Sequence, residues 1–489
     1  MFVLVSVILL CVTVLAWWWL RPRPHSPPVY PGALPLIGHA HSLIGDSKRL
    51  WESNTKLQMY SVNNGGICQI WLGPHTVYVL TDPEDSVTLA NTCYNKPYIY
   101  DFSKDYLKNG LVTAEATVWK HHRKLLNPAF NQQVLNTYVT QINAQAQYLA
   151  SQLASEVGKG SFDARKYLVN FALSTVARTS LGLDPQDETW LSAGYTETIE
   201  DLLGSYTERL RKVWLHLSFI FNWSALKRKQ DQFTNKLKKI TNQIINKRKS
   251  ELKAKKNIIS DDSSDKFKSV LDQLMVLAEE HGDFTHEIIR EHLDTFTATA
   301  YDTTALAITI TLIVLGSNQE IQDRVFKELQ EVFEDENPDI TKEDLPNLVY
   351  MEAVLREAMR LYPSSPLIAR KVDRDVPLKN YTLKAGSTCV LGIYGLLRHP
   401  VWGANVDQFR PERWLDDAES TNHLSRNASF GIGKRNCIGK AFGLMVMKIA
   451  LAQILRRYRV TSNLKNVEWE YEIVLKPVKG HHICLTPRS

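Results

Sequence analysis

FGIGKRNCIG, residues 430–439, contains one cysteine and three glycines. It directly precedes residues 440–457, which we predict to form a long amphipathic helix. A helix that begins just after Cys437 would offer unpaired backbone N–H groups and the positive end of its dipole to a thiolate. Gly433 and Gly439 would let the backbone lie against a flat macrocycle, where a Cβ would collide. A buried cysteine in a glycine-rich turn is the plainer alternative for a single thiol. The order of residue types favours a thiolate that binds a metal.

This loop resembles the haem-binding loop of the cytochrome P-450 superfamily, whose spacing Phe-x-x-Gly-x-Arg-x-Cys-x-Gly is filled at every position. The resemblance implies that haem b is the cofactor and that Cys437 is the axial ligand of its iron. Arg435 is then expected to neutralise a haem propionate. Phe430 is expected to pack beside the sulfur and limit water, and hydrogen bonds to the sulfur would tune the potential of the iron.

Two segments upstream of the loop have a structural role by the same resemblance. Glu357 and Arg360 are three residues apart and share one face of a predicted helix that Pro363 ends. A solvated surface ion pair is the ordinary explanation of such a pair. The stretch FRPERW, residues 409–414, resembles the superfamily's second motif, whose arginine, here Arg413, joins the pair. We therefore expect the three charged residues to be structural, and to tolerate burial because they are paired.

The stretch TAYDTT, residues 299–304, lies inside a long helical pattern and resembles the superfamily's oxygen-activation segment. The resemblance makes Thr303 the proton-relay residue and Asp302 its acidic partner, because a carboxylate beside a hydroxyl can deliver protons through ordered water. The plain alternative is an ordinary helix whose threonine bonds back to a carbonyl one turn earlier.

Two residues of this segment depart from the usual pattern. Ala300 stands where a glycine is usual, which narrows the dioxygen groove slightly without closing it. Thr299 stands where fatty-acid ω-hydroxylases often carry a glutamate that esterifies the haem. A threonine cannot form that ester, so we expect a haem held non-covalently apart from the bond between Cys437 and iron.

A third set of residues is expected to hold the haem propionates. Trp119 and Arg123 are four residues apart on one helical face and resemble the superfamily's W-x-x-x-R helix. Arg370 matches a further propionate-binding arginine, although its motif is short. The adjacent His121 and His122 diverge on a helix, so we interpret them as surface or packing residues rather than as metal ligands.

Helical periodicity over most of the rest of the 489-residue chain, with shorter strand-like stretches, predicts one large, mainly α domain with small β-sheets over residues 41–489. The resemblance implies that this domain has the P-450 fold. Residues 1–20 are almost wholly apolar and end in three tryptophans, which predicts a transmembrane anchor; a cleaved signal peptide is the alternative. Residues 21–40 are rich in proline and predict a stiff hinge. The basic flank after the anchor places the body in the cytosol, at the endoplasmic reticulum membrane.

The resemblance implies a monooxygenase that inserts one atom of O2 into a lipophilic substrate. We find no dinucleotide-binding glycine motif, so electrons are expected from NADPH–cytochrome P-450 reductase, with a b-type cytochrome as a further donor. The motifs look most like the microsomal fatty-acid hydroxylase branch, insect members in particular, which leaves fatty acids, terpenoids and xenobiotics as substrates. A haem-thiolate isomerase or dehydratase and a non-catalytic haem-binding sensor are the alternatives. The net charge of +6 is mild, and no nucleic-acid module is apparent.

Overall fold

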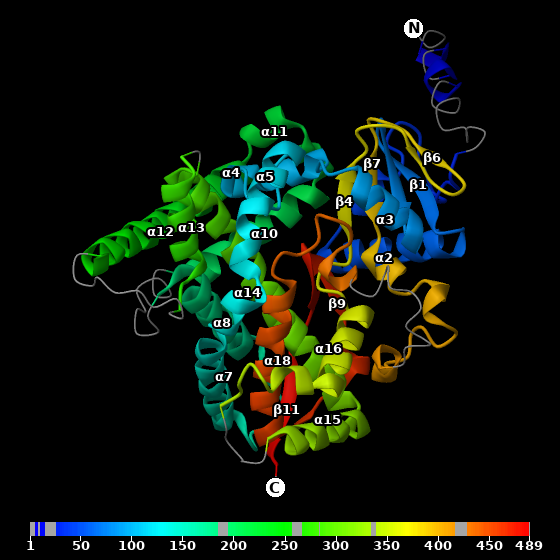
Figure 1. Ribbon diagram of the computed structural model, residues 1–489. Coiled ribbons are helices and arrows are strands. Elements are labelled where there is room, and N and C mark those ends of the chain that lie inside the picture. Colours follow the sequence, from blue (N-terminus) through cyan, green and yellow to red (C-terminus); the bar gives the residue numbers. More distant parts are fainter. Residues whose placement is uncertain are drawn as a thin grey trace.

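Helix α14 (His286–Ser317) forms the axis around which the other helices pack (Figure 1). The structure is a computed structural model, and it describes residues 5–7, 10–14, 26–183, 194–256, 267–282, 284–333, 339–415 and 428–488. The helix begins where the hydroxyl of Thr285 accepts a hydrogen bond from the N–H of Ile288. Most residues of α14 from Ile289 to Gly316 are buried, as expected for a helix in the core of a large domain.

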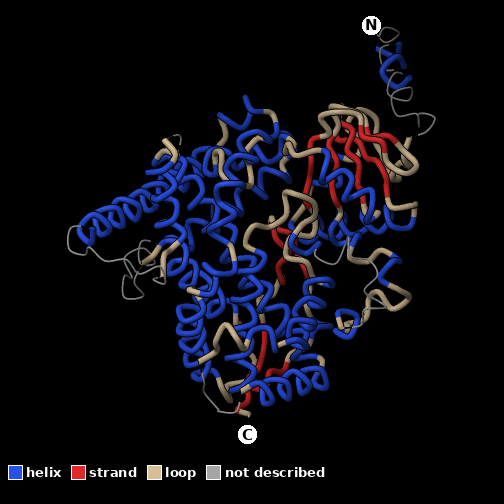
Figure 2. Tube along the Cα trace, viewed as in Figure 1, coloured by secondary structure: helices blue, strands red, loops and turns tan. Residues whose placement is uncertain are grey.

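The other helices surround α14 and make up most of the molecule (Figure 2). Helices α8, α16 and α18 pack directly against it. The α-helices besides α14 are α2 (Ser47–Asn63), α3 (Pro83–Thr92), α4 (Lys104–Leu107), α5 (Ala116–Leu126), α6 (Gln132–Asn136), α7 (Val139–Leu153), α8 (Arg165–Val176), α10 (Tyr195–Arg211), α11 (Ser218–Asn222), α12 (Ala225–Lys256), α13 (Val270–Glu280), α15 (Gln319–Val332), α16 (Val349–Leu361), α17 (Ile393–Leu396) and α18 (Lys440–Arg457).

Among the described residues, four small sheets complete the fold. The sequence predicts a mainly α fold with small β-sheets, without their number. The largest has the order β1-β2-β7-β4, in which β2 and β7 are parallel and the other neighbours antiparallel. A second sheet has the order β3-β11-β8, and β9-β10 and β5-β6 are hairpin pairs. The strands are β1 (Ile67–Leu72), β2 (His75–Leu80), β3 (Phe162–Asp163), β4 (Ile368–Lys371), β5 (Val376–Pro377), β6 (Thr382–Leu383), β7 (Thr388–Leu391), β8 (Tyr458–Thr461), β9 (Trp469–Glu472), β10 (Val474–Pro477) and β11 (His482–Pro487).

The predicted anchor, residues 1–20, lies largely outside the described residues. Within the described part of the chain, α14 is the one helix long and apolar enough to cross a membrane, but most of it is buried, as in the core of a soluble domain. Residues 5–7 and 10–14 are helical, and their apolar side chains are mostly exposed. The part of the predicted hinge from residue 26 onward lies along the first sheet, where Tyr30 donates its N–H to the carbonyl of Gln69.

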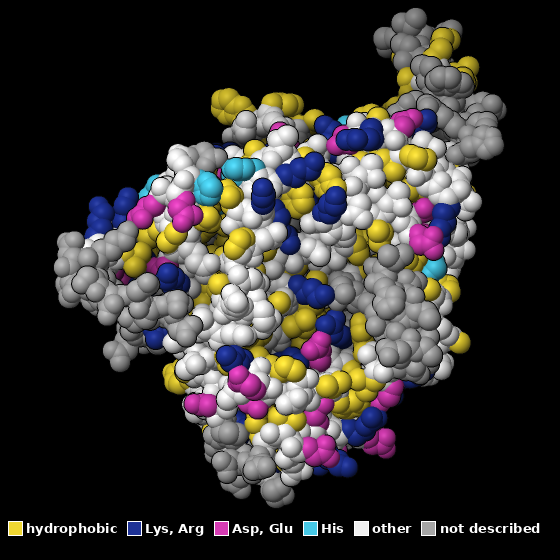
Figure 3. All heavy atoms as spheres, viewed as in Figure 1, with side chains coloured by type: hydrophobic (Ala, Val, Ile, Leu, Met, Phe, Trp, Pro, Cys, Tyr) yellow, Lys and Arg dark blue, Asp and Glu magenta, His cyan; other side chains and the backbone are white. Residues whose placement is uncertain are grey.

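The apolar segment 214–223 forms an exposed tip around α11. Trp214, Leu217, Phe219 and Trp223 are between 49% and 85% exposed, whereas Leu215 and Phe221 on the inner side are buried. In Figure 3, hydrophobic side chains gather at the edge of the molecule over α11. We call Trp214, Leu217, Phe219 and Trp223 the apolar tip. These four exposed side chains lie on the surface of the molecule, while Leu215 and Phe221 hold the segment against it.

Candidate active site

The cysteine loop is folded tightly onto itself in front of α18. The N–H of Cys437 donates to the carbonyl of Phe430 at 2.8 Å, and Asn436 donates to the carbonyl of Gly433 at 3.2 Å. Gly433 has φ of +71°, and a Cβ there would come within 2.7 Å of the Cβ of Ala90 on α3. Gly433 is therefore required by its left-handed backbone and by packing against α3, reasons that the sequence alone does not give. A Cβ at Gly439 would meet only the sulfur of Cys437, at 3.9 Å.

The groups around Cys437 shift the pKa of its thiol in opposite directions. Burial raises the pKa of the Cys437 thiol, while the N–H of Gly439 and the charges of Arg123 and Lys440 lower it. The last three favour the thiolate, the form that binds a metal. Cys437 is closely surrounded by protein atoms but keeps solvent-exposed surface, which leaves room for a ligand.

No group of three or more His, Cys, Asp or Glu residues capable of holding a metal ion occurs within the described ranges. A cysteine thiolate suits the iron of a haem, which brings other ligands of its own.

Within the described residues, two arginines have no carboxylate partner: Arg370, which is fully buried, and Arg435, which is partly buried. Arg370 on β4 is fully buried; its Nη1 donates to the carbonyl of Ala369 at 3.0 Å, but Nε and Nη2 have no hydrogen-bond partner in the structure. Arg435 donates to the carbonyls of Tyr94, Leu111 and Ala114, and burial together with the charge of Arg370 lowers its pKa to about 9. Two close guanidinium groups without a carboxylate fit the two propionates of a haem.

Trp119 and Arg123 on α5 lie on one face but contact different groups. Trp119 is buried, with the guanidinium of Arg435 5.1 Å from its ring centre. Arg123 donates from Nη1 to the carbonyl of Asn436 at 2.8 Å and from Nη2 to the side-chain oxygen of Asn436 at 3.3 Å. Arg123 therefore ties α5 to the residue that precedes Cys437, a contact that the sequence does not predict. His121 is exposed, and His122 is buried with its Nδ1 3.0 Å from Nε2 of His292.

Residues 299–304, for which the sequence predicts a role in oxygen activation, are the place where the buried helix α14 becomes accessible. Between Ile289 and Gly316, Thr299, Ala300 and Thr303 are the residues that are not buried. They are spaced i, i+1 and i+4, so they form one patch on the helix. The hydroxyl of Thr303 donates to the carbonyl of Thr299 at 2.8 Å, the local bond that the sequence offers as the plain alternative. In the same way, the hydroxyl of Thr299 donates to Thr295 at 2.7 Å.

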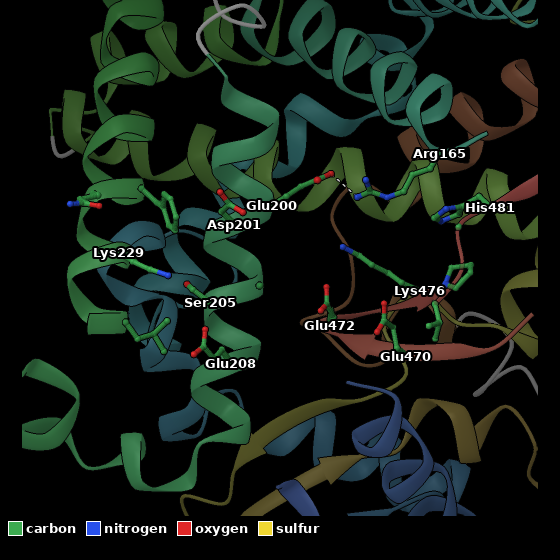
Figure 4. Close-up of a pocket in the computed structure, with 17 residues that line it drawn as sticks. Arg165, Glu200, Asp201, Ser205, Glu208, Lys229, Glu470, Glu472, Lys476 and His481 are labelled. Carbon is green, nitrogen blue, oxygen red and sulfur yellow. Dashed lines mark hydrogen bonds and ion pairs between the residues drawn. The ribbon is translucent and has the colours of Figure 1, made fainter. Parts of the chain in front are cut away.

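Asp302 is held by cations on the outer side of α14. Its carboxylate lies 3.5 Å from the ammonium of Lys476 on β10 and 4.0 Å from the guanidinium of Arg165 at the start of α8. Arg165 also binds Glu200 at 2.6 Å, shown by the dashed line in Figure 4. Asp302 is almost completely buried, and these cations compensate the charge of its carboxylate.

A cleft of about 760 Å³ lies outside these cations, between α10, α12 and the β9-β10 hairpin (Figure 4). Arg165, Lys476 and His481 line this cleft and also the small inner pocket that contains Asp302. The three basic residues thus stand between the cleft and the carboxylate. Sequence patterns do not reveal Arg165 and Lys476, because they lie far from Asp302 along the chain and meet it only through the fold.

Glu357, Arg360 and Arg413 converge in the core beside the cysteine loop. Glu357 and Arg360 are completely buried on α16, and Arg360 donates to both carboxylate oxygens of Glu357 at 2.8 and 2.9 Å. Arg413, in the 3₁₀ turn Pro411–Trp414, adds a bond to Glu357 at 3.0 Å, and Trp414 adds one at 2.9 Å. The hydrogen bonds that the Glu357 carboxylate accepts therefore hold the segment before the cysteine loop against α16.

Comparison with known proteins agrees with this geometry. A family model described as Cytochrome P450 matches residues 27–485. The chain is 30% identical to human "Cytochrome P450 4V2", over 97% of this chain and 91% of the relative. It is 29% identical to "Cytochrome P450 4c3" of Drosophila melanogaster (94% and 89% covered) and 30% identical to "Cytochrome P450 4c21" of Blattella germanica (94% and 93% covered).

Proposed function

The chain belongs to the cytochrome P450 family of haem-thiolate monooxygenases, and from that membership we propose that it oxygenates a lipophilic organic substrate with electrons from an NADPH-dependent reductase. Haem b bound through a cysteine thiolate supplies the activation of O2 and the transfer of one oxygen atom. The observation that carries the proposal is the accessible patch of Thr299, Ala300 and Thr303 on an otherwise buried helix. A sensor or storage protein has no need for such a polar opening in its core.

We assign the haem contacts to individual residues. Cys437 is the thiolate ligand, held in position by the Phe430 carbonyl and by the turn through Gly433 and Gly439. Arg435 and Arg370 face the propionates, because their buried charge has no other described counter-ion. Trp119 supports Arg435, and Arg123 keeps the loop in place through Asn436. Glu357, Arg360 and Arg413 are structural.

The proton route runs through α14. The Thr303 hydroxyl, once released from the carbonyl of Thr299, presents a proton to the accessible side of the helix. Asp302 passes protons on from water at the outer side, and the neighbouring Arg165 and Lys476 position its carboxyl group. The cleft outside Arg165 supplies water. Such positioned acid–base groups contribute about 10²- to 10⁴-fold to a rate.

Electrons enter from the cysteine side. Lys120, Lys124 and Lys434 are exposed and Lys440 is half-buried, around the contact between α5 and the loop. Figure 3 shows Lys and Arg side chains gathered over α5. We assign this surface to an acidic redox partner, NADPH–cytochrome P-450 reductase, with a b-type cytochrome as a second donor.

The protein sits on the endoplasmic reticulum membrane with its body in the cytosol. The sequence of residues 1–20 supports a single-pass anchor, and residues 21–25 begin the hinge. The apolar tip supports a second contact, because four large exposed apolar side chains in one short segment suit the interface of a bilayer.

The substrate is a lipophilic molecule of the fatty acid, terpenoid or xenobiotic class. The test is consumption of O2 and NADPH by the purified holoenzyme with the reductase, across a panel of these three classes. Substrate-dependent consumption and an oxygenated product are expected. Conversion of a hydroperoxide without O2 or reductase would instead favour an isomerase, and no conversion with any class would favour a sensor.

A further inference from the structure

His481 lies in the wall between the cleft and the inner pocket that contains Asp302. It directly precedes β11, its side chain is 5% exposed, and it lines both spaces. Figure 4 shows its ring beside Arg165. The inner pocket has a volume of about 10 Å³, which is enough for one water molecule. Asp302, Arg165 and Lys476 line this pocket and offer such a water charged partners.

Asp163 on β3 fixes the position of His481. Its Oδ1 accepts the backbone N–H of His481 at 3.0 Å and that of Arg165 at 2.9 Å, and lies 3.6 Å from the imidazole Nδ1 of His481. Gly480 permits this approach, because a Cβ there would come within 2.7 Å of Oδ2 of Asp163. The side chain of His481, and then the two N–H groups, lower the pKa of the Asp163 carboxyl. A carboxylate beside Nδ1 keeps a proton on that nitrogen and leaves Nε2 for exchange with water.

Of the three basic residues that line both spaces, His481 is the one suited to exchange protons. Arginine keeps its proton at any ordinary pH, and lysine ordinarily does so at neutral pH. Arg165 and Lys476 also face carboxylates, since Arg165 binds Glu200 at 2.6 Å and Lys476 lies 3.5 Å from Asp302. Histidine changes its charge between pH 5 and 8. His481 can therefore take up a proton on the side of the cleft and release it on the side of Asp302.

We propose that His481 supplies protons to Asp302 through one water molecule in the inner pocket, a role that rests on the proposed monooxygenase activity. The imidazolium gives the proton on Nε2 to the water, and the water gives a proton to the carboxylate of Asp302. Water in the cleft then returns a proton to Nε2. Only O–H and N–H bonds form and break, and no electron moves. Because His481 acts through Asp302, it is a positioning residue.

The coupling of His481 to Asp302 can be tested without turnover. The charged groups that face His481 are Asp163 on β3, Arg165 at the start of α8, Asp302 on α14 and Lys476 on β10. Nuclear magnetic resonance of nitrogen-15-labelled histidine in the ferrous carbon monoxide holoenzyme follows each imidazole, and the signal lost in His481→Gln identifies His481. Asp302→Asn should move this titration toward lower pH by about half a pH unit or more, because a nearby carboxylate favours the imidazolium. The exposed neighbour His482 should not respond, and an unchanged His481 would overturn the proposal.

The turnover test compares two sources of oxygen. With O2 and NADPH, product formation needs protons from the relay, whereas hydrogen peroxide brings reduced oxygen together with its own two protons. With O2 and NADPH, the parent rate should fall as the pH rises from 6 to 8 and the imidazolium is lost. His481→Gln should be about tenfold slower and lack this pH dependence, yet stay within about twofold of the parent with peroxide. His482→Gln is the matched control and should behave as the parent in both reactions.

The outcomes separate a failure of this role from a failure of the proposed function. Equal rates for His481→Gln and the parent with O2 and NADPH would overturn the role of His481. A loss that is as large with peroxide would show a merely structural defect and overturn it too. Should His481→Gln yield no holoenzyme, His481→Asn takes its place, and failure of both would likewise show a structural role. A parent protein inactive in both reactions would contradict the proposed function itself.

Discussion

The ammonium of Lys476 lies 3.5 Å from the carboxylate of Asp302, on the side of α14 that faces the charged cleft. The acidic residue next to Thr303 is thus held from outside, by a strand near the C-terminus. The relay that the sequence predicts as a local Asp-Thr pair therefore depends on distant parts of the chain. Asp302 contacts a cation on another element, whereas the hydroxyl of Thr303 is hydrogen-bonded within its own helix.

The proposed role of Thr303 in proton relay predicts that Thr303→Val uncouples NADPH consumption from product formation. Without the hydroxyl, protons reach the accessible side of α14 more slowly, so we expect the ratio of product to NADPH consumed to fall about tenfold or more. Oxygen consumption should continue and end in peroxide. Thr311→Val is the matched control, because Thr311 is buried on the same helix and donates to a carbonyl four residues earlier in the same way. Equal coupling in the two variants would rule out a relay role for Thr303.

Removal of the Glu357 carboxylate is predicted to destabilise the fold. Glu357→Ala leaves Arg360 and Arg413 buried without their counter-ion, a change that costs about 3–5 kcal/mol. We expect little soluble holoenzyme and a clearly lower midpoint in urea. Glu331→Ala is the control, because its ion pair with Lys327 is exposed on both sides and is worth less than about 1 kcal/mol. Similar midpoints for the two variants would contradict the structural role of Glu357.

His292 predicts a loss of stability in acid. Burial, and then the neighbouring His122, lower its pKa from 6.5 to about 3 in the folded protein. Below pH 6.5 the unfolded chain takes up a proton that the folded protein does not, so the free energy of unfolding falls as the pH drops toward 3. Between pH 6.5 and 4 this amounts to about 3 kcal/mol.

The same pH series on His292→Asn should give a shallower slope. His286→Asn is the control, since His286 is exposed at the start of the same helix. Urea unfolding at several pH values measures the slopes. A slope in His292→Asn as steep as in the parent would show that other groups cause the acid sensitivity.

The apolar tip predicts membrane binding that does not need residues 1–20. We expect a chain without these residues to sediment partly with lipid vesicles. Phe219→Ser with Trp223→Ser should then release it, because each buried ring contributes about 2 kcal/mol. Val276→Ser with Val349→Ser is the control, since these two exposed valines lie elsewhere on the surface. If the shortened chain with an intact tip stays in solution, the tip has no part in membrane binding.

Local patterns in the sequence predict much of this fold. Cys437 and the glycines before it mark the end of a loop. The helix predicted for residues 440–457 is α18, and both of its bounds are correct. The β-branched and aromatic residues of Ile67–Leu72 likewise favour a strand, and this stretch forms β1. Backbone preference and burial of one face act over a few residues, which is why such elements can be predicted.

Contacts that join distant residues could not be predicted in the same way. Nothing near Asn436 marks it as the acceptor for Arg123, and nothing near Asp302 marks Lys476 as its partner. These contacts arise only when segments far apart in the chain come together in the fold. The reason for Gly433 is also tertiary, because the atom that its Cβ would meet belongs to α3.

The central claim is that Cys437 is the thiolate ligand of the haem iron. Cys437→Ser replaces a soft thiolate by a hydroxyl that binds iron weakly, with almost no change in size. The ferrous carbon monoxide spectrum of the purified protein measures the ligand directly. The parent should show the red-shifted Soret band of thiolate-ligated haem, and Cys437→Ser should lack it even where haem is retained. A Cys437→Ser protein that keeps this band would contradict the account.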